Sequence, residues 1–367
     1  MASRTIRYSI LIAVYLATAG LTYGLHPNLG LANPRYGLIH MVRGDAHEPF
    51  VRRALVPTLV RGTDALLPNS VRGWINQKAN RRVNRSGIRA DFLAEKQEMF
   101  GVMSTNWSIA AVGAFYIVLS LAGTLFVLRR LLVVLYYPPS MVADVFPLLL
   151  IAMLPVFRAH SNFIYDYPGL LLFALATLCI VTKQWRAYGV TYVLALLNKE
   201  TAVLLPLVFA VTQYDVMERK RLVKNIAAQV ATAVVVLGSL AWMFHNNPGE
   251  VAEVHPSRNV AFLTDIRNFF RFDSLGPSLL APGGLPVRMP VGLNLPYWLV
   301  VAGCIVPGWR SAPPVLRRSL LALLVPLVLL QFFFGFVDEV RDLYEAMPVI
   351  IALMYASANR VWGPRTA

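Results

Sequence analysis

Residues 188–214, YGVTYVLALLNKETAVLLPLVFAVTQY, hold three polar side chains between two apolar runs. Asn198, Lys199 and Glu200 follow ten residues of the first run and precede fourteen of the second, with no polar buffer on either side. At such a depth in a bilayer an ionisable side chain is costly, so it usually pairs or faces a water-filled cavity, and it often marks a functional site. We therefore expect a membrane protein with buried polar chemistry.

The composition is typical of a chain that resides in lipid. Of its 367 residues, 57% are hydrophobic and only 14% are charged, unlike an average soluble domain. The net charge of +15 does not indicate a nucleic-acid partner, because most basic residues flank apolar segments and no nucleic-acid-binding motif accompanies them. Both cysteines, Cys179 and Cys304, lie inside apolar runs, which excludes a disulfide framework and a cysteine-based metal site.

Apolar segments near the length that crosses a ~30 Å hydrocarbon core recur along the chain. The first could be a cleaved signal peptide ending near residue 19, but its apolar stretch continues past that point and favours an uncleaved anchor. We predict an all-α, polytopic transmembrane helix bundle that forms a single transmembrane domain over residues 1–367. Its eight full spans are expected near residues 8–25, 108–128, 139–157, 168–182, 225–244, 291–308, 319–337 and 346–358.

Basic residues set the expected orientation. Fifteen of them share one side of the membrane if residues 187–215 enter and leave on the same face, and the positive-inside rule makes that side cytoplasmic. We therefore predict a broken, re-entrant helix pair over residues 187–215 and cytoplasmic N- and C-termini, in a bacterial inner membrane. A single tilted span is the alternative, and it would export two of the basic clusters. The fifteen residues are Arg4, Arg7, Arg129, Arg130, Lys183, Arg186, Arg219, Lys220, Arg221, Lys224, Arg310, Arg317, Arg318, Arg360 and Arg365.

Two long segments are expected on the outer side, residues 26–107 and 245–290. Within the first, residues 49–67 place apolar side chains near helical spacing with arginines among them, which predicts an amphipathic surface helix kinked at Pro57. Residues 72–89 are polar and basic, and we predict a solvated connector there that also meets lipid phosphates.

Four groups of polar residues could converge on the outer side. A carboxylate at a membrane surface can accept a proton from a hydroxyl or bind a hard cation such as Mg²⁺ or Mn²⁺, and arginine suits a phosphate. Each group also has a structural alternative, namely a helix N-terminus, a span cap, an ion pair within the helix pair, or a solvated loop. P-loop, HExxH and GxSxG motifs are absent. The candidates are Asp45, Glu48, Arg52 and Arg53; His160, Tyr165 and Asp166; Asn198, Lys199 and Glu200; and Glu339 and Arg341.

The same residues, set among many spans, resemble the GT-C superfamily of integral-membrane glycosyltransferases. The similar runs are residues 45–57, Tyr165-Asp166-Tyr167-Pro168, Asn198-Lys199-Glu200-Thr201, and Glu339-Val340-Arg341 with Pro348. Members of that superfamily have a catalytic acidic residue in a long first outer loop, amphipathic helices in that loop, and shortened middle helices that leave an outward-facing cavity.

The resemblance implies inverting transfer of a sugar from a polyprenyl-phosphate donor to a glycan, lipid or protein acceptor at the outer face. It implies that Asp45, or else Glu48, is the general base or a metal ligand. Arg341, Lys199 or an arginine of the surface helix would then hold the lipid phosphate. The acidic motif departs from the plain DxD pattern. Metal use and acceptor class therefore stay open.

Two other functions also stay open. An O-antigen ligase or polymerase-like enzyme would share the basic outer loop and the outward cavity. A transporter or flippase of a lipid-linked or anionic substrate would share the buried charges and the broken helix, although no paired broken segments occur in two matching halves.

Overall fold

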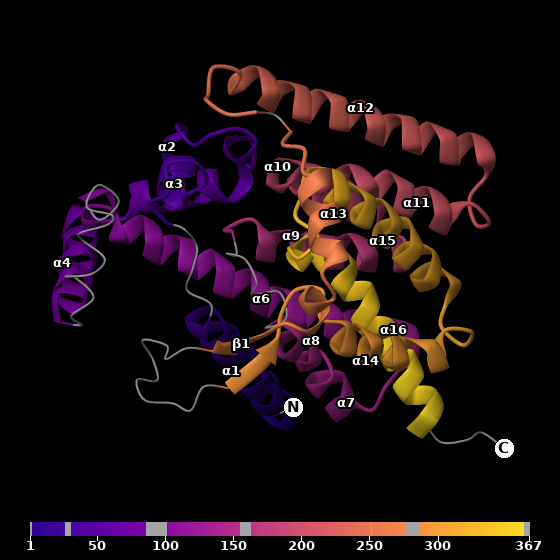
Figure 1. Cartoon of the computed structure of the whole chain (residues 1–367). Coiled ribbons are helices and arrows are strands. Elements are labelled where there is room, and N and C mark those ends of the chain that lie inside the picture. Colours follow the sequence, from indigo (N-terminus) through magenta and orange to yellow (C-terminus); the bar gives the residue numbers. More distant parts are fainter. Residues whose placement is uncertain are drawn as a thin grey trace.

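The computed structural model describes residues 2–25, 31–85, 101–154, 163–250, 252–275 and 287–362, and within them the chain is all-helical except for one short hairpin (Figure 1). That hairpin pairs β1 (Phe272–Leu275) antiparallel with β2 (Val287–Pro290), with Asp273 opposite Met289. The expected all-α class is confirmed.

Four of the described helices are long and apolar enough to cross a membrane, by length and composition. They are α1 (Ala2–Leu25), α6 (Trp107–Tyr136), α12 (Arg219–Met243) and α15 (Pro314–Phe334). The eight full spans expected from hydropathy are not confirmed, because the other apolar segments form shorter helices. These are α7 (Ser140–Val145) and α8 (Leu148–Met153), α9 (Asp166–Val181), α11 (Leu205–Gln213), α14 (Leu295–Ile305) with the 3₁₀ helix η5 (Val306–Gly308), and α16 (Met347–Trp362).

The helices are shorter than hydropathy predicts because of prolines and helix ends, which a hydropathy average does not take into account. Pro147 stands between α7 and α8, where it lacks the N–H that would continue the helix. The sixteen residues of α9 rise only about 24 Å at 1.5 Å per residue, less than a ~30 Å hydrocarbon core. The short helices therefore leave space at one end of the bundle.

Helices α6, α9 and α16 form the centre of the bundle. On α6, Ile117, Leu121, Leu125 and Leu128 are fully buried at intervals of three or four residues, the spacing of one helical face. By contrast, α12 runs along the upper edge of the molecule in Figure 1, and few of its side chains are buried.

The chain reverses direction within residues 185–213. Helix α10 (Trp185–Asn198) ends at Lys199, whose backbone is extended, and the 3₁₀ helix η3 (Glu200–Leu204) then leads into α11. The Trp185 and Phe209 rings lie 5.5 Å apart, whereas 24 residues of straight helix would separate them by about 36 Å. The Tyr188 hydroxyl likewise donates to the Leu205 carbonyl at 3.1 Å. The two arms therefore lie side by side, with Lys199 and Glu200 at the turn.

Residues 26–107, predicted to be the first outer segment, differ in their described part from the predicted layout. They contain α2 (Leu38–Arg43), the 3₁₀ helix η1 (Phe50–Arg52), α3 (Leu55–Leu66) and α4 (Asn69–Arg85). The single helix expected over residues 49–67 is wrong: a break at Arg53 and Ala54 divides it, and Pro57 lies in the first turn of α3, where proline causes no kink. Much of the expected connector over 72–89 is also helix, since α4 reaches Arg85.

A second outer segment packs on the first. It holds α13 (Pro256–Thr264), the 3₁₀ helix η4 (Ile266–Phe270) and the hairpin. The side chain of Asn247 donates to the carbonyls of Gly44 and Ala46, each at 2.9 Å, and the Glu48 N–H donates to the Pro248 carbonyl. These bonds fix the turn around residues 44–48 against the chain that follows α12. The 3₁₀ helix η6 (Val340–Ala346) completes this end of the molecule.

Candidate functional site

A cavity of about 590 Å³ lies where six distant parts of the chain meet. Its wall comes from residues 35–36, 49–53, 163–166, 200, 252–255 and 334–342. Short helices and helix ends supply most of it: η1, the N-terminal end of α9, the first residue of η3, and the segment from the end of α15 into η6. The short middle helices thus position a polar cavity at one end of the bundle.

Arg53 is held on this wall by an aromatic ring and a carboxylate. Its guanidinium lies over the Tyr165 ring, 4.2 Å from the centroid, and its Nε donates to Glu200 Oε2 at 3.1 Å. Burial lowers the pKa of Arg53, but attraction to Glu200, Tyr165 and Asp166 outweighs that effect and leaves the pKa raised. The side chain therefore stays charged although it is only 15% exposed.

Arg341 is held in the same way from the opposite end of the sequence. Its guanidinium lies 3.9 Å from the centroid of the Phe163 ring, and it contacts Glu339 and Asp166. Phe163 stacks on Tyr165 at 5.2 Å between centroids. Arg53, which follows η1, and Arg341 of η6 thus lie on one pair of stacked rings, which fixes both cations with little freedom left to lose on binding.

Lys199 and Glu200 point to different partners, as expected for successive residues. Glu200 binds Arg53, whereas Lys199 Nζ lies 3.1 Å from Glu345 Oε1 and 3.4 Å from Asp342 Oδ1 in η6. Thr201 also donates to Glu345, at 2.7 Å. Lys199 therefore ties the turn of the helix pair to η6, while Glu200 faces the cavity.

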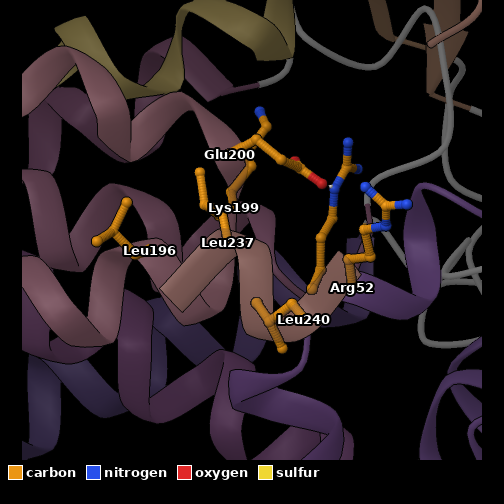
Figure 2. A pocket seen from close by; sticks show the side chains of 7 residues that line it. Arg52, Leu196, Lys199, Glu200, Leu237 and Leu240 are labelled. Carbon is orange, nitrogen blue, oxygen red and sulfur yellow. Dashed lines mark hydrogen bonds and ion pairs between the residues drawn. The ribbon is translucent and has the colours of Figure 1, made fainter. Parts of the chain in front are cut away.

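A second, smaller crevice of about 120 Å³ adjoins the cavity (Figure 2). Leu196 of α10 and Leu237 and Leu240 of α12 form its apolar side. Arg52, Arg53, Lys199 and Glu200 form its charged side, and Figure 2 shows the Glu200 carboxylate directed away from the leucines. Arg52, Arg53 and Glu200 also line the large cavity, so these three residues separate the two spaces.

Most of the residues predicted as a site are brought together. Asn198 is buried, and its side chain donates to the Tyr165 carbonyl at 2.9 Å, so it holds the backbone beside the cavity. His160 lies outside the described residues. Seven of the predicted residues line the large cavity: Arg52, Arg53, Tyr165, Asp166, Glu200, Glu339 and Arg341.

The two predicted acidic residues of the first loop lie outside the lining of both spaces. Glu48 is buried and binds Arg52 through both carboxylate oxygens, at 2.7 Å each. Asp45 is 56% exposed and lies 3.0 Å from the Nδ1 atom of His40, its neighbour in the same turn. This pair does not fit a metal site, because Arg52 occupies both Glu48 oxygens. Within the described ranges no group of three or more His, Cys, Asp or Glu side chains could hold a metal ion.

Besides Tyr36 and Asp342, three polar residues of the wall were not predicted: Arg35, Glu253 and His255. Arg35 forms an ion pair with Glu253, and His255 lies beside Glu253. More than 200 residues separate Arg35 from the other two in sequence. No local motif marks them, and only the packing of the second outer segment on the first brings them together.

Comparison with known proteins adds no relative: no family model, no curated protein and no solved structure matches this chain.

Proposed function

We propose that this protein is a membrane glycosyltransferase. In this proposal it moves a sugar, with inversion, from a polyprenyl-phosphate-linked donor to an acceptor at the extracytoplasmic face of a bacterial inner membrane. The observation that carries the proposal is the junction of two unlike spaces at Arg52, Arg53 and Glu200.

The two spaces match the two ends of a lipid-linked sugar. The leucine-lined crevice of about 120 Å³ equals roughly four water volumes of ~30 Å³, so it suits one short hydrocarbon unit next to a head group. The cavity of about 590 Å³ lies within the ~300–1,000 Å³ range of small-molecule sites and has room for a sugar and part of an acceptor. A phosphate between tail and sugar would then lie at the junction.

Arginine chemistry at the junction suits that phosphate. A guanidinium carries five N–H donors in a fixed fork that matches phosphate oxygens, and only the Nε–H of Arg53 is needed for its bond to Glu200. As the bond between sugar and phosphate breaks, negative charge grows on the leaving lipid phosphate. A pre-positioned cation stabilises this charge without reorganisation, which lowers the barrier.

The remaining wall suits a sugar. Tyr36 and Phe50 add ring surfaces to the wall, and the carboxylates of Glu200 and Asp342 can accept hydrogen bonds from hydroxyl groups. A single displacement on such a bound sugar inverts the reacting carbon, by analogy with inverting hydrolases.

The test uses purified protein in nanodiscs, a polyprenyl-phosphate sugar labelled in the sugar, and the variant Arg53→Gln. We expect the wild type to release or transfer the label and to bind polyprenyl phosphate. Loss of charge-assisted hydrogen bonds worth ~1.5–3 kcal/mol should weaken polyprenyl-phosphate binding about tenfold or more in Arg53→Gln. Arg267→Gln is the matched control, because Arg267 is exposed and pairs with Asp265 away from the cavity.

Other results would point elsewhere. Neither binding nor turnover of any polyprenyl-phosphate sugar by the wild type would reject the proposal. Movement of an unchanged substrate across proteoliposomes would instead identify a transporter or flippase. Transfer only from a lipid-linked polysaccharide would indicate a ligase or polymerase of the O-antigen type.

A further inference from the structure

His255 occupies a fixed position in the wall of the large cavity. It stands at the N-cap of α13, and its N–H donates to the Phe333 carbonyl at 2.9 Å. Its ring stacks on Phe336 with 4.4 Å between centroids and 25° between planes. Backbone and ring are thus both anchored to the end of α15 and the loop that follows.

Charged groups surround this imidazole on several sides. Its Nε2 lies 3.5 Å from Glu253 Oε2 in the same segment, and Glu253 pairs with Arg35 of the first outer segment. Arg258 of α13 lies over the Phe336 ring on which His255 stacks. In the loop after α15, Asp338 binds Arg271 at 3.0 Å. A carboxylate facing Nε2 favours the tautomer protonated there, which leaves the lone pair on Nδ1.

The carboxylates of the cavity wall all take part in ion pairs. The carboxylates that line the cavity each have a cationic partner: Asp166 and Glu339 contact Arg341, Glu200 binds Arg53, Asp342 lies near Lys199, and Glu253 pairs with Arg35. Each of these carboxylates therefore serves as the counter-ion of a buried or half-buried cation.

His255 differs from those carboxylates in both charge and partner. Burial, Arg258 and Arg35 all lower its pKa from the ordinary value of 6.5. Because the pKa of the imidazole is lowered, the ring is neutral at pH 7 and its lone pair can accept a proton.

We propose that His255 is the general base of the transfer reaction, an inference that rests on the function proposed above. The acceptor hydroxyl gives its proton to the imidazole, and its oxygen bonds to the anomeric carbon of the sugar. The bond from that carbon to the phosphate oxygen breaks, and its electron pair leaves with the polyprenyl phosphate. The imidazolium later returns its proton to water.

The first test compares His255→Gln with His245→Gln in sugar transfer across a pH series. His245 is the matched control, because it is exposed at the end of α12 and outside the cavity lining. Loss of a general base typically costs about 10²–10⁴-fold, so we expect kcat of His255→Gln to fall by about 100-fold or more. Polyprenyl-phosphate binding should persist, and the acid limb of the kcat/KM profile should disappear.

The second test uses Arg258→Gln to move the pKa of His255 without removing it. Arg258 lowers that pKa, so its loss should raise it and shift the acid limb of kcat/KM to higher pH, with the plateau rate retained. A purely structural histidine would show no such shift. A limb that stays in place in Arg258→Gln would count against the proposal.

The remaining outcomes are also decisive. If the wild type transfers sugar and His255→Gln keeps its rate and its acid limb, His255 is not the base and the glycosyltransferase assignment stands. Loss of transfer in Asp45→Asn alone, with His255→Gln active, would return the role to Asp45. A wild type that neither binds nor uses lipid-linked sugars would overturn both proposals.

Discussion

At the scale of single residues, the stability of the fold depends on close packing as well as on charge. Gly308 of η5 lies against α16: its N–H donates to the Ser357 hydroxyl at 2.8 Å, and that hydroxyl donates to the Ile305 carbonyl at 2.9 Å. A Cβ atom at Gly308 would lie 2.3 Å from the Ser357 backbone nitrogen, which is shorter than any allowed van der Waals contact distance.

We therefore predict that Gly308→Ala destabilises the fold by about 1–3 kcal/mol, the usual cost of overpacking. Gly238→Ala is the matched control, because a Cβ there meets nothing within 4 Å and alanine favours a helix. Thermal unfolding in detergent, followed by loss of the monodisperse peak, measures both variants. Equal melting temperatures for Gly308→Ala and the wild type would contradict the close contact.

At the residue level, the predicted residues that line the two spaces include charges that interrupt apolar runs. Lys199 and Glu200 are recognisable in the sequence because an ionisable side chain at bilayer depth costs free energy. Arg341 lies in a charged run between two apolar segments. Arg35 and His255 carry no such local signal, because their position depends on how two outer segments pack. Asp45 was predicted both from the acidic residues of its own segment and from the resemblance, and its side chain contacts His40 of α2. Whether Asp45 acts in catalysis stays a prediction.

At the scale of elements, α1 packs into the bundle along one face of its middle turns. Leu11, Tyr15 and Ala19 are buried, and the Tyr15 hydroxyl donates to the Asp144 carbonyl at 2.7 Å. The Asp144 carboxylate binds Arg7 of α1 at 2.5 Å and Arg129 of α6 at 2.7 Å. These contacts favour the expectation that residues 1–19 remain as an anchor.

We predict that Asp144→Ala weakens the fold by about 2 kcal/mol, because hydrogen bonds to charged groups contribute ~1.5–3 kcal/mol and two arginines lose their shared partner. The matched control is Asp215→Ala, since Asp215 is largely exposed, pairs with Arg318, and such surface pairs contribute ~0–1 kcal/mol. Denaturant titration of the two variants compares them. A larger loss in Asp215→Ala than in Asp144→Ala would refute the role given to α1.

Element boundaries were predicted less well than element type. Hydropathy identified helices in the apolar segments, but a window average does not register the interruption at Pro147 or the change from α14 to the 3₁₀ helix at Val306. The break after Asn198 was predictable because three polar residues coincide there. The helical state of residues 69–85 was not, because that segment is polar and packs on α6 through Asn76 and Asn80.

At the scale of the whole molecule, two groups of residues lie at opposite ends. Basic residues contact neighbouring segments at one end, and the cavity residues gather at the other. Arg7 and Arg129 share Asp144, Arg318 donates to the Val211 carbonyl at 3.2 Å, and Arg360 donates to the Pro307 carbonyl at 2.5 Å. The cavity gathers residues from the other ends of the same helices, such as Asp166 of α9 and Phe334 of α15. This separation supports the proposed orientation, with basic ends in the cytoplasm and the cavity outside.

The last prediction tests that orientation by cysteine labelling. Single cysteines replace Arg186, Lys220 or Val254, all exposed, in a protein lacking Cys179 and Cys304. Because the α10–α11 pair reverses direction, positions 186 and 220 should lie on one side of the membrane and 254, after α12, on the other. A membrane-impermeant maleimide added to intact cells should label position 254, and should label 186 and 220 only after permeabilisation. Labelling of 220 but not 186 from outside would mean that residues 188–214 cross the membrane once, and the shared-side arrangement would be wrong.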